Sequence, residues 1–473
     1  MLVVPPHTAG YYNCPSSHSS HSSHGGACLP TFAHPARTCV FVQVSRRYRE
    51  GFIVFLIAME EPGTATGKAA AHSNGTSPES FQHPQAFGQP TTPAAKCLYV
   101  IRQKSVISRA DLITATGLSQ PTITRAITTL LNEGYVVARD DLARSHGRGR
   151  PTTPVELAKP LWMLAGIAVG TKETFLSVFD IRGRTIREST IDTPVAELTE
   201  SDFIQHIMAG LHRLVTGLEH TLLSVGVTTS GQVSRDGVVS APNLGWEQVD
   251  VAASLRYQFS VPVSVSSAVP AILGSEMQAG DLLVSDDSER TLVLFADDSI
   301  GAAYTNPSGV HPIDVLPPIS NTELDISAAA PEKTLITRYI LQQIAGLSPA
   351  TEGASSAPAE YSPQTLADAV AIADSDTAVR KILDARASTL AKLTVDLVKE
   401  HKISTVVVAG SAFVDDPLTP KIFAATVREI MTKEKAPKMR MVPTHEEVVR
   451  SITRAAALDQ MLREPLKLVR SDD

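Results

Sequence analysis

Hydrophobic side chains recur at helical spacing in successive short segments that begin near residue 93. The apolar run within residues 98–101 marks a first helix. Ser108 is a suitable N-cap for a second helix, which covers Arg109 to about Thr116 and ends at Gly117. The spacing therefore predicts two short helices before residue 118.

A third helix and a β-wing follow directly. Ser119 is the expected N-cap, and Pro121 stands in the first turn, where a missing N–H costs nothing. Gly134 ends the helix, and Tyr135–Val137 begins a strand. The apolar face of this helix carries Ile123, Ile127, Leu130 and Leu131. Three helices followed by a hairpin predict a winged helix-turn-helix.

Beyond Pro151 the pattern changes to apolar strands that alternate with amphipathic helices, which is typical of mixed α/β lobes with largely buried sheets. The main predicted strands cover residues 164–169, 174–180, 185–190, 222–227, 261–265, 291–295 and 405–409. The long predicted helices cover about 200–219 and 378–400.

The first 92 residues differ from the rest. A low-complexity tract spans His18–His24, and residues 60–92 are rich in Gly, Pro, Ser, Thr and Ala. We expect residues 1–92 to be a disordered or mis-annotated N-terminal extension and linker, with Met59 as the true first residue.

Composition narrows the class of protein. The 473 residues suggest two or three domains, and 43% hydrophobic with 19% charged side chains is ordinary for a globular chain. The longest apolar run, Phe52–Met59, is far shorter than the ~18 residues that span a bilayer, so no membrane partner and a cytoplasmic location are expected. All cysteines precede residue 98, which excludes a disulfide framework or a Cys-ligated metal in the main body.

Charge is unevenly distributed along the chain. Residues 93–150 carry nine basic and four acidic side chains, whereas the formal net charge of the whole chain is −7. A small basic module before a large acidic body indicates that the small module meets a polyanion.

The third helix is the candidate DNA-recognition helix, because an α-helix fits the major groove and its first residues reach base edges. Gln pairs with adenine and Arg with guanine, while hydroxyls reach phosphates or bases. The candidates are Ser119, Gln120, Thr122, Ile123, Thr124 and Arg125. The alternative is a winged helix that contacts only other proteins. The excess of basic over acidic side chains in residues 93–150 disfavours it.

Two arginines follow the wing in the run Gly147-Arg148-Gly149-Arg150-Pro151. Arginines on an extended segment suit a narrow, A·T-rich minor groove, where the potential is most negative. The alternative is a basic interdomain linker. The position of Arg148 and Arg150 beside the wing favours insertion into the groove.

The run SRADLITATGLSQPTITRAITTLLNEGYVV, followed by GRGRP, resembles the DNA-binding module of the ROK family of repressors and sugar kinases. SVGVTTSGQVSRDGVVSAPNLGW, PVSVSSAVPAILGSE and ISTVVVAGSAF are similar to three regions of that family's body, and the resemblance covers about 93–473. It implies an α/β fold class: an N-terminal winged helix-turn-helix, residues 93–152, then two actin-like (ribonuclease H-like) α/β lobes. The lobes would cover 160–265 and 266–473, with the C-terminal helix returning to the first lobe. A dimer or tetramer is also implied.

Departures from the family pattern concern its kinase chemistry. The first phosphate loop lacks its Asp and one glycine at Ala168–Thr171, and the catalytic base is replaced at Ser266-Ser267-Ala268. The second phosphate loop is Asp297-Asp298-Ser299, whose carboxylates would repel a triphosphate. The family's zinc segment has no counterpart, and His311 stands alone. We therefore expect no catalytic residues, no cofactor and no metal.

These observations favour a DNA-binding transcriptional regulator, acting as a repressor, on a degenerate sugar-kinase-like body. Its expected partners are double-stranded DNA with a pseudo-palindromic operator and further copies of the chain. Ser230, Gly231 and Asn243 could line a pocket for a sugar or another metabolite, or could form a structural turn.

Two other functions stay open. One is an ATP-dependent, glucokinase-like sugar kinase with an appended DNA-binding module, and the absent carboxylate at Ala268 argues against it. The other is an architectural DNA-binding protein without an effector.

Overall fold

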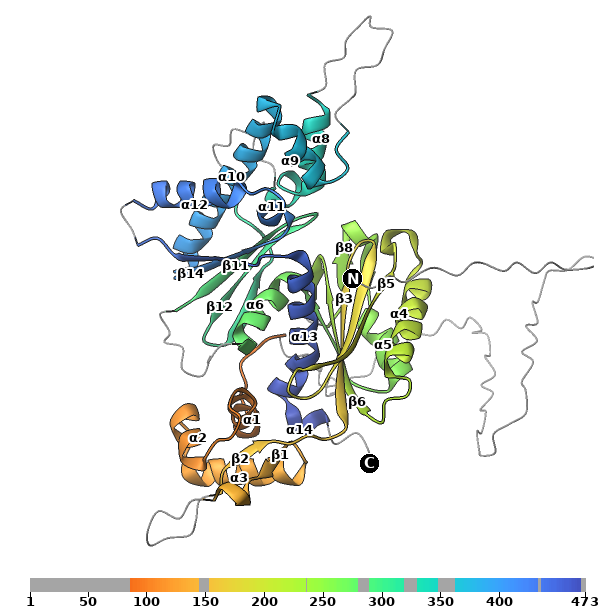
Figure 1. The fold of residues 1–473 in the computed structure, drawn as a ribbon, viewed down its shortest axis with the longest axis vertical. Coiled ribbons are helices and arrows are strands. Elements are labelled where there is room, and N and C mark those ends of the chain that lie inside the picture. The colour runs from red at the N-terminus through yellow and green to blue at the C-terminus, as the bar shows by residue number, and fades with distance from the viewer. Residues whose placement is uncertain are drawn as a thin grey trace, which may run out of the picture. The chain divides into compact units, whose positions relative to one another are not determined.

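The computed structural model describes residues 86–143, 153–234, 236–279, 289–318, 330–347, 362–432 and 435–468 (Figure 1). The His18–His24 tract, Met59, Arg148 and Arg150 lie outside the described residues, so the predictions made for them stay predictions.

The first described module is the winged helix-turn-helix that the sequence predicts. Its helices are α1 (Pro93–Gln103), α2 (Arg109–Thr116) and α3 (Gln120–Asn132). The wing pairs β1 (Val136–Ala138) with β2 (Val155–Leu157) in antiparallel register, and the 3₁₀ turn η1 (Asp140–Leu142) follows β1.

Local capping explains why these helices begin and end where they do. The Ser108 side chain accepts a hydrogen bond from the Asp111 amide, and the Asp111 carboxylate accepts one from the Ser108 amide. Gly117 closes α2 with a φ of 66°, which a side chain would strain. Ser119 caps α3, with Pro121 in the first turn. The predicted caps are confirmed.

The first sheet of the body has the strand order β10-β6-β3-β4-β5. Helices α4 (Glu200–Val215) and α5 (Val251–Phe259) pack on one face, and α13 (His445–Arg463) contacts β3, β4 and β6 on the other. Gly166 and Gly226 let the backbone of α13 approach, because a Cβ at either glycine would overlap it. The strands are β3 (Trp162–Val169), β4 (Glu173–Phe179), β5 (Thr185–Asp192), β6 (Thr221–Thr229) and β10 (Val263–Ser267).

The second sheet has the order β13-β12-β11-β14-β15. Helix α6 (Ala268–Ala279) packs on one face, and the helices of the 330–432 region pack on the other. Figure 1 shows α6 and α13 between the two sheets. The strands are β11 (Thr291–Ala296), β12 (Ile300–Asn306), β13 (Gly309–Ile313), β14 (Thr405–Ala409) and β15 (Lys438–Met441).

Shorter elements complete the described body. The helices are α7 (Pro331–Thr334), α8 (Thr337–Ala345), α9 (Leu366–Ala373), α10 (Thr377–His401), α11 (Ser411–Val414), α12 (Thr419–Ile430) and α14 (Pro465–Leu468), with the 3₁₀ turns η2 (Val195–Glu197) and η3 (Pro242–Leu244). A small antiparallel sheet joins β7 (Gln232–Val233), β8 (Val239–Ala241) and β9 (Trp246–Val249).

Within the described ranges, no helix is both long enough and apolar enough to cross a bilayer.

The predicted α/β fold class is confirmed, and some boundaries are corrected. Helix α4 ends at Val215 rather than near Glu219, because Thr216 leaves the helical region and Gly217 adopts a φ of 74°. The predicted linker also ends too late. Phe87 is buried, and Gly88 forms a β-bridge with Gly309, so residues 86–92 belong to the folded body. The limits proposed for the two lobes stay predictions.

The winged helix shares a hydrophobic core with the C-terminal helices. Leu98, Ile101 and Ile127 cluster with Leu458 and Met461 of α13, and the Tyr135 hydroxyl donates a hydrogen bond of 2.8 Å to the carbonyl of Pro465. The module is therefore packed on the body, and α3 lies on its outer side, away from α13 (Figure 1).

Candidate functional site

The exposed face of α3 presents hydrogen-bond donors to solvent. Gln120, Thr124 and Arg125 are exposed. Within the part of the chain that the structure describes, the side chains of Gln120 and Arg125 make no hydrogen bond or ion pair. These two groups therefore remain available for a partner such as a base edge.

Hydroxyl groups at the start of α3 already have partners within the helix. The Ser119 hydroxyl accepts the Thr122 amide at 3.4 Å and lies 2.9 Å from the Thr122 hydroxyl. The Thr124 hydroxyl donates to the Gln120 carbonyl at 2.9 Å. A phosphate contact by these hydroxyls requires them to rotate, so their present role is to fix the N-terminus of the helix.

The structure contradicts the prediction that Ile123 contacts DNA. Its side chain is fully buried and packs in the core with Ile127 and Leu130. Helical spacing places all three on the inner face of α3, so Ile123 cannot reach a base edge. Thr128, one turn beyond Thr124, is exposed, and its hydroxyl donates to the Thr124 carbonyl at 2.9 Å.

Part of the basic charge of the module is already neutralised or buried. Arg139 in the wing forms ion pairs with Asp141 at 2.6 Å and Glu156 at 2.8 Å, and these hydrogen bonds raise its pKa. Arg102 donates to the Gln278 carbonyl at 2.8 Å, and burial lowers its pKa. The count of basic residues therefore overstates the charge that α1 to β1 offer to DNA.

In the body, the structure brings the three predicted ligand residues together. The Asn243 amide donates to the Ser230 hydroxyl at 2.9 Å, and that hydroxyl lies 3.1 Å from the Asn243 carbonyl oxygen. Gly231 adopts a φ of 83° and lies so close to Ser240 and Ala241 that a side chain would overlap them. The turn is built around backbone contacts, and the side chains of Ser230 and Asn243 form hydrogen bonds with each other.

The position that the family resemblance assigns to the catalytic base carries Ala268. Strand β10 ends at Ser267 and α6 begins at Ala268. The Ser266 hydroxyl donates to the neighbouring carbonyl of Ser267 at 2.9 Å. A methyl group at Ala268 cannot accept a proton.

Two carboxylates, of Asp297 and Asp415, line a cavity in the body. A cavity of about 230 Å³ is lined by Asp297, Gly410, Ser411, Val414, Asp415 and His445. Asp297 accepts the Ser411 amide at 3.1 Å. Burial, and then the charge of Asp297, raise the pKa of Asp298 and of Asp415. Asp415 and His445 were not predicted, because they come from segments far apart in the sequence.

Arg386 interacts electrostatically with Asp297 and Asp298. Arg386 is buried, and its desolvation lowers the pKa to about 10. It donates to the Leu335 carbonyl at 3.0 Å and to the Thr337 hydroxyl at 3.1 Å. His311 is held by Ser308 and Asn306, and among the described residues no group of three His, Cys, Asp or Glu side chains could hold a metal ion.

Sequence comparisons match the two parts separately. Residues 164–287 match the sequence model of the ROK family, and residues 98–137 match that of a winged helix-turn-helix DNA-binding domain. Transcriptional regulator Rv0485 of Mycobacterium tuberculosis (strain ATCC 25618 / H37Rv) is 32% identical over 220 residues, which cover 46% of this chain and 50% of that protein. The xylose repressor of Bacillus subtilis (strain 168) is 27% identical over 173 residues, covering 35% and 44%. The chain thus spans about half the length of these curated relatives.

Solved structures agree on the fold. A ROK family transcriptional regulator, described as a homolog of the E. coli MLC protein, aligns with a TM-score of 0.61 at 16% identity. The alignment covers 79% of this chain and 98% of that one. A ROK hexokinase from Thermus thermophilus aligns with a TM-score of 0.50 at 17% identity over 63% of this chain and 98% of its own. At these identities the likeness concerns the fold.

Proposed function

We propose that this chain, which carries a ROK family domain behind a winged helix-turn-helix domain, is a DNA-binding transcriptional regulator that acts as a repressor. The observation that carries the proposal is the free, exposed pair Gln120 and Arg125 on the first turns of α3. Relatives named as transcriptional regulators and xylose repressors support it.

The body serves this function without phosphoryl transfer. Such transfer needs a positioned base, a phosphate cradle and a metal that offsets charge. Ala268 replaces the base, and Asp297 with Asp298 places negative charge where a phosphate would bind. These features separate the chain from the sugar kinases that share its fold.

A homodimer or tetramer in the cytoplasm would place two copies of α3 on a pseudo-palindromic operator, with half-sites about 10 bp, or a multiple of that, apart. Ser119, Thr122 and Thr124 would support phosphate contacts, and Arg148 with Arg150 would enter the minor groove. Ser230, Gly231 and Asn243 would line the site of a small-molecule effector.

Selection of duplexes from a random pool by the full-length protein, followed by footprinting, tests the DNA-binding function. We expect enrichment of paired half-sites. Absence of any enriched sequence, or one isolated half-site bound at full affinity, contradicts the proposal. A coupled phosphorylation assay on the same preparation separates it from the kinase alternative.

A ligand screen separates a sensing repressor from an architectural DNA-binding protein. Xylose is one candidate suggested by the relatives, together with other sugars and sugar phosphates. We expect a ligand found by thermal shift or calorimetry to lose affinity in Asn243→Ala and to change operator binding. A binder that leaves operator affinity unchanged contradicts the sensing role.

A further inference from the structure

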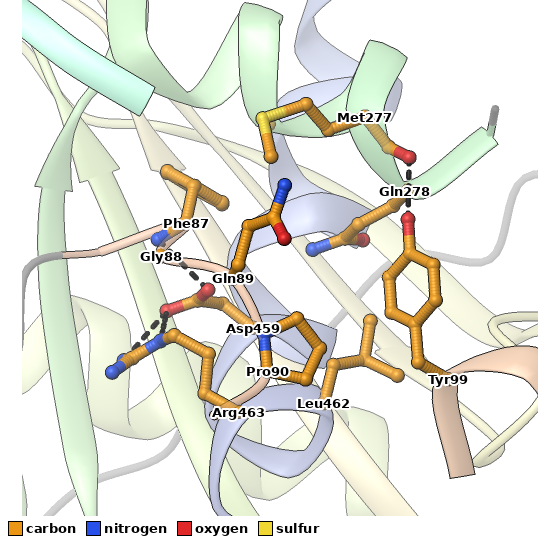
Figure 2. A pocket seen from close by; sticks show the side chains of 11 residues that line it. Phe87, Gly88, Gln89, Pro90, Tyr99, Met277, Gln278, Asp459, Leu462 and Arg463 are labelled. Atoms are coloured by element: carbon orange, nitrogen blue, oxygen red, sulfur yellow. Dashed lines mark hydrogen bonds and ion pairs between the residues drawn. The ribbon is translucent and has the colours of Figure 1, made fainter. Parts of the chain in front are cut away.

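The segment Phe87–Pro90 lies shortly before α1 and is held by α13 and by the hairpin of β12 and β13 (Figure 2). The Phe87 amide donates to a carboxylate oxygen of Asp459 in α13 at 2.9 Å. The Phe87 carbonyl accepts the Val310 amide at 3.2 Å, and the Gln89 amide donates to the Ser308 carbonyl at 3.1 Å. The segment thus extends the edge of the second sheet while it is tied to the helix that covers the first.

The side chain of Phe87 fills a space made for it. Phe87 is 3% exposed, and its ring lies against Gly274 of α6, where any Cβ would overlap the ring. Phe87 also adopts a φ of 57°, which a bulky residue rarely does. Such a conformation persists only where the surroundings fix it, and it is concentrated in ligand clamps and switches.

A buried ion pair depends on the same segment. One oxygen of Asp459 accepts both Nε and Nη2 of Arg463, at 2.9 and 2.8 Å, while the other accepts the Phe87 amide. Asp459 is only 3% exposed. Because a buried carboxylate needs all its partners, withdrawal of Phe87 leaves one oxygen unpaired.

Helix α1 follows the segment and is fastened to α6. The Tyr99 hydroxyl donates to the Met277 carbonyl at 2.6 Å (Figure 2), and Arg102 donates to the Gln278 carbonyl. A shift of α6 relative to α13 therefore acts on α1 through Phe87–Pro90 and through these two bonds.

We propose that Phe87–Pro90 is a latch that sets the orientation of the winged helix and transmits rearrangement of the two lobes to it. Helix α13 connects the latch with the cavity of the body, because His445 lines that cavity and Asp459 lies about 21 Å further along the helix. Where operator affinity is the readout, the inference rests on the proposed function.

The first test is a double-mutant cycle on Phe87 and Gly274. Gly274→Ala should displace the ring, lower operator affinity about tenfold and increase amide exchange in residues 87–103. In the Phe87→Ala background the added methyl group has room, so Gly274→Ala should then have little further effect. Equal effects in both backgrounds contradict the latch. Tyr257→Ala, on a side chain that is 90% exposed, is the control and should change neither readout.

The second test fills the cavity in place of an unidentified ligand. Val414→Trp should change operator affinity at least about fivefold when Phe87 is present, and less than twofold in Phe87→Ala. Amide exchange of residues 87–103 should follow the same pattern without DNA. A change that is equal in both backgrounds, or absent from both, overturns the inference. Lack of any DNA binding by the unaltered protein, with the exchange pattern intact, refutes only the proposed function.

Discussion

The exposed face of α3 and the cavity beside Asp297 offer opposite chemistry. On α3, Gln120 and Arg125 point donors to solvent and have no partner among the described residues. In the cavity, Asp297 already accepts the Ser411 amide, a backbone donor that could otherwise serve an anion. The donors on α3 are free to contact a partner, whereas in the cavity a carboxylate of the chain itself accepts the backbone donor.

The difference shows that a shared fold does not fix what each surface binds. The fold aligns with that of a solved ROK family regulator, whereas the proposal assigns Ala268, Asp297 and Asp298 to positions where a kinase would need a base and a phosphate loop.

The largest expected effect concerns phosphoryl transfer. Loss of the general base alone typically costs 10²–10⁴-fold in rate, and the acidic cavity opposes nucleotide binding as well. The protein should show no turnover of ATP with a panel of hexoses and amino sugars in a coupled assay containing magnesium. Micromolar ATP affinity by calorimetry, together with turnover above background, would restore the kinase alternative.

Removal of the free cation on α3 should have the next largest effect. Arg125→Ala should weaken binding to the best operator by about 1–3 kcal/mol, since one base contact is lost. Arg213→Ala removes the same charge from an exposed position on α4 and should leave affinity unchanged. Fluorescence anisotropy titrations would measure both. Equal losses would mean that only net charge matters.

Loss of the α3 cap should have a moderate effect on stability. Ser119→Ala should lower the stability of α3 by about 0.5–2 kcal/mol, because the Thr122 amide loses its acceptor. Amide exchange across α3 is the measurement, and Ser105→Ala, on an exposed serine outside any helix, is the control. Unchanged exchange in Ser119→Ala would show that the cap contributes nothing.

A smaller effect is expected from the arginines beyond the wing. The double change Arg148→Ala with Arg150→Ala should weaken binding most when the operator flanks are A·T-rich. Affinities for one core site with A·T-rich and with G·C-rich flanks would be compared. Equal weakening on both flanks would make these arginines phosphate contacts.

No effect is expected from removal of residues 1–58. Their sequence has little patterned apolar content that could join a core. Thermal unfolding and operator affinity of the shortened chain should match those of the full chain. A fall in either would assign this segment a role.

The winged helix was predictable almost residue by residue, because its signals are local. Ser108, Gly117 and Ser119 define the ends of α2 and α3 by contacts within four residues. Strand β14 and helix α10 were also predicted closely, since a buried apolar run and a long amphipathic stretch specify them.

Contacts between distant segments could not be predicted in the same way. Residues 86–92 resemble a linker in composition, and the Phe87 amide donates its hydrogen bond to Asp459, 372 positions away. The cavity likewise combines Asp297 with Asp415 and His445. Ile123 illustrates a different error, because its position near the start of α3 suggested a base contact while its helical phase placed it in the core.

Selection of duplexes repeated with Arg125→Ala tests most directly whether α3 reads DNA sequence. The same random pool would be used for the altered and the unaltered protein. We expect preference to relax at one base position in each half-site while the spacing of the half-sites is kept. An unchanged base preference at every position would contradict sequence recognition by α3.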